Sequence, residues 1–125
     1  MQLLHINPVE HVSVDQDRLG ALYSQLGASG AEDIVCRALE ELALRLSHCE
    51  TLFRSGCWPE LRKNVRSLIA ISDQIGMSAL SHRAKDVTRC IDQQDITAVA
   101  ATLSRLMRIG EGSLTAVWDL HDLPV

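Results

Sequence analysis

The 125-residue sequence is poor in aromatic residues, which make up 3% of it, although 46% of its residues are hydrophobic. A core built from this composition consists mainly of Leu, Ile, Val and Ala side chains. Leu and Ala favour helices, whereas aromatic residues favour strands. No stretch alternates polar and apolar residues in the manner of a half-buried strand. The composition therefore favours an all-helical protein, and the length is that of one domain.

Long apolar runs are also missing from the sequence. No segment approaches the roughly 20 apolar residues that a helix needs to span a bilayer. The N-terminal stretch MQLLHINPVEHV has neither a basic leader nor a long apolar core, so we expect no signal peptide and no membrane anchor. The four cysteines, Cys36, Cys49, Cys57 and Cys90, form no C-x-x-C pair. We interpret them as reduced thiols of a cytoplasmic protein.

The motifs of common enzymes and metal sites are absent as well. There is no Gly-x-Ser-x-Gly nucleophile elbow and no glycine-rich phosphate loop. No Glu is followed by His three residues later, which excludes the ligand pattern of di-iron bundles. A zinc site from His48, Cys49, Cys57 and His82 is conceivable, but these residues lack the spacing of zinc ligands. We therefore expect a non-enzymatic protein without a metal or a cofactor.

Charge is unevenly distributed along the chain. The formal net charge is −4, which argues against nucleic acid as the main partner. Residues 62–89 nevertheless contain six basic and two acidic residues, a net charge of +4, which leaves −8 for the remainder. This part of the molecule would suit an acidic partner.

Apolar residues at helical spacing predict two helices in the first half of the chain. A short helix is predicted to begin at the capping sequence SVDQ (13–16), and a long one at SGAE (29–32). Gly27 and Gly30 bracket the break between them. The positions expected to be buried are Leu19, Leu22 and Leu26, followed by Val35, Ala38, Leu42, Leu46, Cys49 and Phe53.

Three further helices are predicted in the second half. Gly56 and Pro59 separate the long helix from the next, Gly76 ends that helix, and Asp95 caps the last one. Gly110 and Gly112 would bend the last helix or allow a neighbour to pack closely. The positions expected to be buried are Leu61, Val65, Leu68, Ser72 and Ile75; Met77, Leu80, Ala84, Val87 and Ile91; and Ile96, Val99, Leu103, Leu106, Gly110, Leu114 and Val117.

The connections between these helices are short, which is typical of antiparallel neighbours. The predicted fold is an all-α antiparallel four-helix bundle over residues 13–121, with a short N-terminal helix laid across it. Residues 1–12 form an N-terminal extension and residues 122–125 a C-terminal tail.

Over four-fifths of the chain, from about Asp15 to Asp119, resembles the histidine-containing phosphotransfer (HPt) domains of bacterial phosphorelays. DRLGALYSQLG is similar to their opening helix, and SGCWPELRKNVRSL to the loop and helix that carry the phosphorylated histidine. QIGMSALSHRAKDV is similar to the helix that follows, and QQDITAVAATLSRL to their last turn and helix. The resemblance implies the HPt-like bundle fold, and a response-regulator receiver domain or a histidine kinase as the partner.

The chain departs from the family's signature, which is His-x-Leu-Lys-Gly followed by a second Gly six residues later. With Gly76 on the second Gly, Arg66 takes the place of the histidine, Ile69 that of the lysine and Ala70 that of the first Gly. A guanidinium stays protonated and offers no lone pair to a phosphoryl group. We therefore predict a pseudo-HPt that binds its partner without carrying phosphate. The candidate partner-binding residues are Arg62, Arg66, Ile69, Ala70 and Asp73.

Two alternatives follow from the same residues. An active phosphotransfer protein would need another histidine, and His82, in line with Lys85 and Arg89, is the first candidate; a solvated surface histidine is its other interpretation. His48 is expected near the end of a helix, where an imidazolium favours the dipole. The third interpretation is a helical interaction or dimerisation module outside signalling, with Arg66 an ordinary surface arginine.

Overall fold

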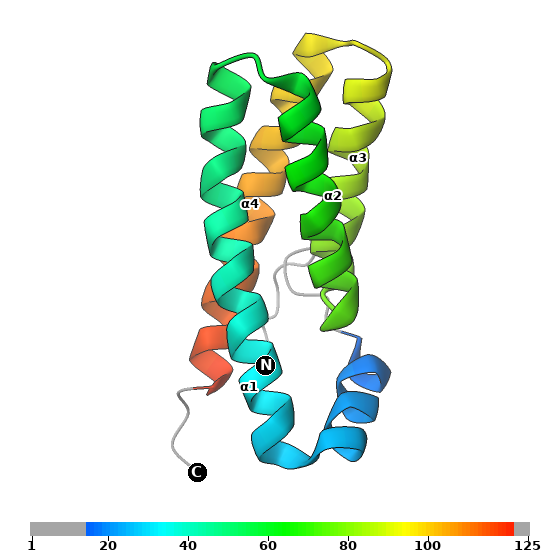
Figure 1. Cartoon of the computed structure of the whole chain (residues 1–125), viewed down its shortest axis with the longest axis vertical. Helices are drawn as coiled ribbons and strands as arrows, with labels where there is room; N and C mark the ends of the chain where they lie inside the picture. The colour runs from blue at the N-terminus through cyan, green and yellow to red at the C-terminus, as the bar shows by residue number, and fades with distance from the viewer. Residues whose placement is uncertain (1–14, 122–125) are drawn as a thin grey trace, which may run out of the picture.

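The computed structural model describes residues 15–121, and the regular structure within this range is helical. Figure 1 shows the four helices side by side, with the α1–α2 and α3–α4 connections at one end and the α2–α3 connection at the other. The prediction of an all-helical protein is confirmed. The predicted extension (1–12) and tail (122–125) lie outside the described residues. The helices are α1 (Gln16–Arg54), α2 (Trp58–Gln74), α3 (Ser78–Asp92) and α4 (Ile96–His121).

Helix α1 joins the first two predicted helices into one element with a kink. The kink lies at Gly27, whose φ of 78° and ψ of 168° are not helical, and a positive φ is favoured by glycine because it has no Cβ. The segment before Gly27 turns away from the long axis of α1 (Figure 1). The prediction that Leu26 is buried is wrong: it is 45% exposed, because it lies beside this kink.

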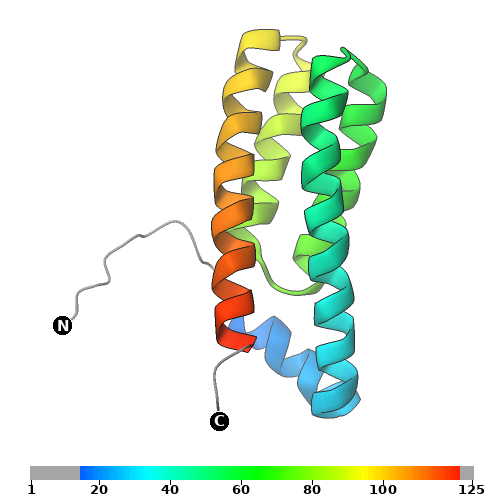
Figure 2. The same cartoon turned by 90° about the vertical axis from the view of Figure 1, so that its left-hand side faces the viewer.

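The start of α1 is fastened to the connection between α2 and α3. Asp15 caps α1 by accepting a hydrogen bond from the Arg18 amide at 3.1 Å; the predicted capping residue Ser13 lies outside the described range. The Asp15 amide donates to the Gly76 carbonyl at 2.6 Å, and Arg18 Nε donates to the Gln74 carbonyl at 3.2 Å. A Cβ at Gly76 would lie 2.9 Å from the Asp15 oxygen. Figure 2 shows this N-terminal segment at one end of the molecule.

The interior is one hydrophobic cluster to which all four helices contribute. The predicted inner positions of α2 are buried, and those of α3 are buried except for Ile91, which is half-buried. The prediction for Ile96 is wrong: it is 57% exposed at the first position of α4. Leu39 and Ile109 are buried although they were not predicted. The reason is that α1 packs against both α2 and α4, and α4 against both α1 and α3, so their buried faces are wider than one stripe.

Gly110 marks a close approach between α1 and α4. A Cβ at this position would lie 2.6 Å from Cδ1 of Leu46, a residue that is itself buried. Of the two expectations for Gly110, close packing is therefore confirmed. Gly112, two residues later in the same helix, is exposed, and its would-be Cβ meets no neighbouring group within 4 Å in the described part of the chain.

The two glycines provide a matched test of this packing. Gly110→Ala should lower the free energy of unfolding by about 1–3 kcal/mol, because the added methyl group overpacks the core against Leu46. Gly112→Ala should raise it by about 0.5–1 kcal/mol, because alanine favours the helix and meets open space. Urea denaturation followed by circular dichroism measures both. Equal stabilisation of the two variants would contradict the close approach.

Candidate functional site

The predicted site lies on α2, whose rotation about its own axis is set by its buried face. Leu61 and Leu68 have no exposed surface. With 3.6 residues per turn, Arg66 lies on the opposite side of the helix, and it is exposed. Ala70 and Asp73, one and two turns further on, are exposed as well. These three candidate residues therefore share the outer face of α2.

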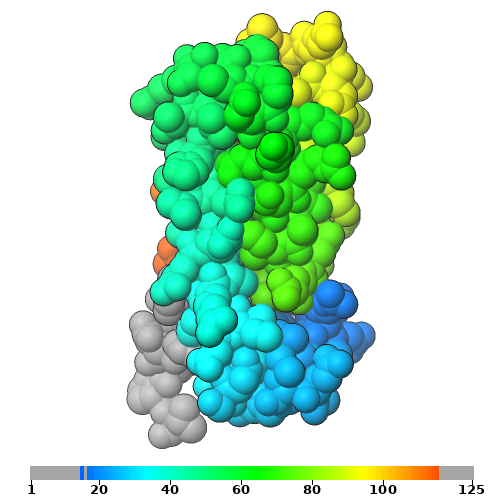
Figure 3. All heavy atoms as spheres, in the orientation of Figure 1, coloured from blue at the N-terminus to red at the C-terminus, as the bar shows by residue number. Residues whose placement is uncertain are grey.

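A shallow hollow surrounds Arg66 on this face. It is lined by three cations, Arg62, Lys63 and Arg66, and by the smaller side chains of Pro59, Ser67 and Ala70. Figure 3 shows the surfaces of α1 and α2 side by side on one face of the molecule. Arg66 and Lys63 have no ion-pair partner among residues 15–121. Both charges can thus pair with an incoming acidic group, although the charge of Arg66 also helps to lower the pKa of Asp92.

Arg62, the other predicted cation of the site, is already engaged. Its Nε and Nη2 atoms donate to the two carboxylate oxygens of Asp92 on α3, at 2.7 and 3.1 Å. These hydrogen bonds raise the pKa of Arg62 and lower the pKa of Asp92. The bidentate geometry holds the guanidinium in place. Arg62 therefore connects α2 to α3, and its charge is balanced before any partner arrives.

The basic excess predicted from residues 62–89 is also reduced on α3. Asp86 receives ion pairs from Arg83 at 3.3 Å and from Arg89 at 2.5 Å. In this part of the described chain, Lys63, Arg66 and Lys85 remain without an ion pair. The positive charge is therefore confined to a few side chains.

Ile69, a candidate partner-binding residue, is half-buried and packs against the hydrophobic core. Part of its side chain already contacts the protein, so it offers less area to a partner than a fully exposed residue would. Ala70 is exposed and lines the hollow around Arg66.

The two histidines considered above lie on different helices. His82 is exposed on α3, with Lys85 one turn and Arg89 two turns further along. His48 is exposed in α1, which continues to Arg54. His48 thus lies near the end of α1, as expected, but not in the last turn, whose basic residue is Arg54.

Among the described residues, no three His, Cys, Asp or Glu side chains gather in a group that could hold a metal ion. Within the same part of the chain, no helix is both long enough and apolar enough to cross a bilayer.

A buried polar network behind the site was missed by sequence analysis. Asn64 is 6% exposed; its Nδ2 donates to the Arg45 carbonyl at 2.8 Å and to Cys49 Sγ at 3.3 Å. Arg45 Nη1 in turn donates to Asn64 Oδ1 at 3.1 Å. One amide side chain thus ties α2 to two turns of α1. The only signal in the sequence was an asparagine beside the inner stripe of α2, next to Val65.

Burial raises the pKa of the Cys49 thiol from 9.0 to about 11, against the opposing effects of the Asn64 hydrogen bond and the Arg45 charge. The unfolded chain releases this proton near pH 9 and the folded chain near pH 11, so stability is lost as pH rises through this interval. Between these pH values the wild type should lose about 2–3 kcal/mol more than Cys49→Ala. Urea denaturation at matched pH measures the difference. Parallel pH profiles for the two proteins would contradict it.

Comparison of the chain with protein-family models, with curated proteins and with solved structures finds no match.

Proposed function

We propose that this protein is an HPt-like signalling module, an antiparallel four-helix bundle that binds a receiver domain or a histidine kinase without carrying phosphate. One observation carries the proposal. Arg66 is exposed on the outer face of α2, at the position that matches the family's phosphorylated histidine, and it has no ion-pair partner among the described residues. The side chain is thus presented outward, as a docking residue would be.

The chemistry of arginine supports binding rather than transfer. A phosphorelay histidine attacks an aspartyl phosphate with a nitrogen lone pair, and a guanidinium has none. Its planar fork can instead donate two hydrogen bonds to one carboxylate. Docked at the acidic phosphorylation pocket of a receiver, Arg66 would take the space that a phosphoryl group occupies. The module would then compete with genuine phosphotransfer partners and sequester the receiver.

The surroundings of Arg66 suit such a contact. Lys63, one turn away, adds a second available charge, and the exposed Ala70 leaves room for close approach. Arg62 also lines the hollow, but its guanidinium is already paired with Asp92 and fixes α2 against α3. Asp73 is exposed at the far end of the same face, where it would discriminate against partners that carry an acidic group at that place.

The second candidate function is an active phosphotransfer protein that uses His82. It is favoured by the exposure of this imidazole and by Lys85 one turn away, a cation without an ion pair among residues 15–121. Such a lysine could balance the charge of a phosphoryl group. The pseudo-HPt proposal is preferred because the exposed Arg66 and Ala70 on α2 stand at positions that align with the family's signature.

Phosphoryl labelling separates the two candidates. Incubation with a receiver domain phosphorylated on its aspartate should leave the wild type unlabelled, because residue 66 cannot accept the group. Acid-labile label that disappears in His82→Ala would establish the alternative. Label that survives in His82→Ala but is lost in another single histidine variant would overturn both.

Binding tests the docking face directly. Arg66→Ala should weaken the complex with an unphosphorylated receiver by about 1–3 kcal/mol if the ion pair is desolvated at the interface. Ala70→Asp should weaken it further, because it places a carboxylate against the acidic pocket. Isothermal titration calorimetry measures both affinities.

The controls follow from the structure. Ile69→Asp would also disturb the core, because Ile69 is half-buried, so Ala70→Asp is the cleaner variant. Lys85→Ala removes an available cation from another helix and should leave the affinity unchanged. If Arg66→Ala and Ala70→Asp bind as the wild type does, this face of α2 is ordinary surface.

A further inference from the structure

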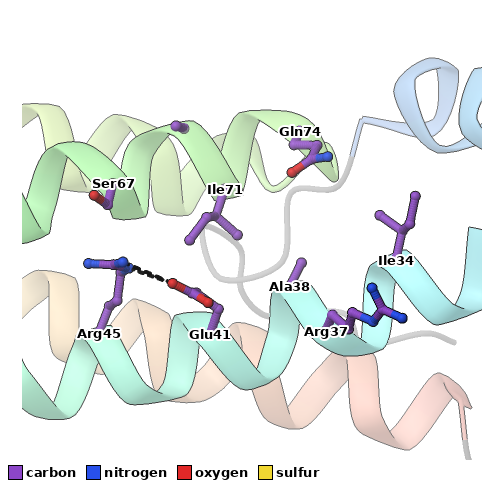
Figure 4. Close-up of a pocket in the computed structure, with 9 residues that line it drawn as sticks. Ile34, Arg37, Ala38, Glu41, Arg45, Ser67, Ile71 and Gln74 are labelled. Atoms are coloured by element: carbon purple, nitrogen blue, oxygen red, sulfur yellow. Dashed lines mark hydrogen bonds and ion pairs between the residues drawn. The ribbon is translucent and has the colours of Figure 1, made fainter.

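A groove distinct from the hollow around Arg66 runs between α1 and α2. Figure 4 shows its lining side chains, which come from residues 34–45 of α1 and 67–74 of α2. Along α1 this is about three helical turns, or roughly 16 Å. Ile34, Ala38 and Ile71 supply an apolar floor. The groove is thus long enough and apolar enough to accept one face of a short helix.

Among the charged residues of the groove, one cation has no ion-pair or hydrogen-bond partner in the described part of the chain. Glu41 and Arg45 form an ion pair at 2.9 Å, drawn as the dashed line in Figure 4, and Arg45 also donates to Asn64. Arg37 is exposed and has no ion-pair or hydrogen-bond partner among the described residues. The groove therefore presents an available positive charge near its Ile34 end.

This charge belongs to a wider pattern. The groove and the hollow around Arg66 adjoin, because Ser67 and Ala70 line both. In the described part of the chain, four Arg and Lys side chains have no ion-pair or hydrogen-bond partner. Three of them line these two depressions, and the fourth lies on α3. The four are Arg37, Lys63, Arg66 and Lys85.

We propose that the α1/α2 groove docks an acidic amphipathic helix of a partner protein. The apolar face of that helix lies on Ile34, Ala38 and Ile71, and a carboxylate at its border pairs with Arg37. Two other common modes of peptide recognition do not suit this surface. An added strand requires a sheet edge, which residues 15–121 do not offer, and polyproline recognition requires aromatic side chains, of which the groove lining has none.

The charges of the groove lining favour an acidic helix over a basic one, because the single acidic residue of the lining is already paired with Arg45. The exposed Glu32, Asp33 and Glu40 lie on α1 outside this lining. The inference holds whether or not the partner is a receiver domain, because Arg37 lies on α1, outside the residues that the proposed function requires.

The test uses the full-length chain and two synthetic helices of about 14 residues, each fixed in helical form by a covalent staple. Both carry Leu along one face; the first carries Glu along the borders of that face, and the second carries Lys at the same places. Nuclear magnetic resonance titration should show shifts in residues 34–45 and 67–74 with the acidic helix, and none there with the basic helix.

Two charge reversals complete the test. Arg37→Glu should weaken binding of the acidic helix at least about tenfold and allow the basic helix to bind, because the pairing charge is inverted. Lys85→Glu makes the same change in net charge on α3 and should alter the affinity by less than about twofold. The proposal is overturned if the acidic helix, at about 1 mM, causes no shift in residues 34–45. It is also overturned if both variants weaken binding of the acidic helix equally. No receiver domain takes part, so failure here is distinguishable from failure of the proposed function.

Discussion

The burial of one face of α2 is the constraint on which the rest of the molecule depends. Leu61, Val65 and Leu68 have no exposed surface, and each contributes about 1.5–3 kcal/mol by leaving water. Rotating α2 by one residue would expose part of this stripe and turn a charged side chain toward the core. The helix therefore has one stable rotation, and that rotation presents Arg66 and Ala70 to solvent.

Polar contacts then fix α2 against its two neighbours. On one side Asn64 accepts a hydrogen bond from Arg45 and donates hydrogen bonds to the α1 backbone and to Cys49. On the other side Arg62 forms an ion pair with Asp92 of α3. The same contacts decide which cations are available. Arg45 and Arg62 form ion pairs and hydrogen bonds within the protein. Arg37 and Arg66, on the outer surfaces of the same two helices, have no ion pair among the described residues.

The proposals for Arg66 and for the groove share one physical basis, which is that Arg37, Lys63 and Arg66 line the two depressions without an ion pair among the described residues, although the protein as a whole is acidic. The many exposed carboxylates of the protein repel acidic surfaces in general. Only a partner that places its carboxylates against these few cations would overcome this repulsion. A small number of arginines can thus select an acidic partner without making the molecule basic.

The sequence by itself determined the helices, their ends and most of their buried positions. This is because helical periodicity, capping and glycine conformation are local properties. Gly56 and Gly76 adopt the positive φ that ends a helix, and the Asp95 side chain accepts a hydrogen bond from the Ala98 amide. Predictions failed where the outcome depended on neighbours, as at Leu26 beside the kink and Ile96 at the start of α4.

The tertiary structure alone decided which charged residues form ion pairs or hydrogen bonds across helices. Arg62 and Asp92 are 30 residues apart, and Arg45 and Asn64 are 19 apart, so no local pattern in the sequence reveals either contact. The α1/α2 groove likewise exists only after two helices lie side by side. Periodicity states which face of a helix is polar, but the pairing of polar groups across helices depends on distances that only the packed molecule defines.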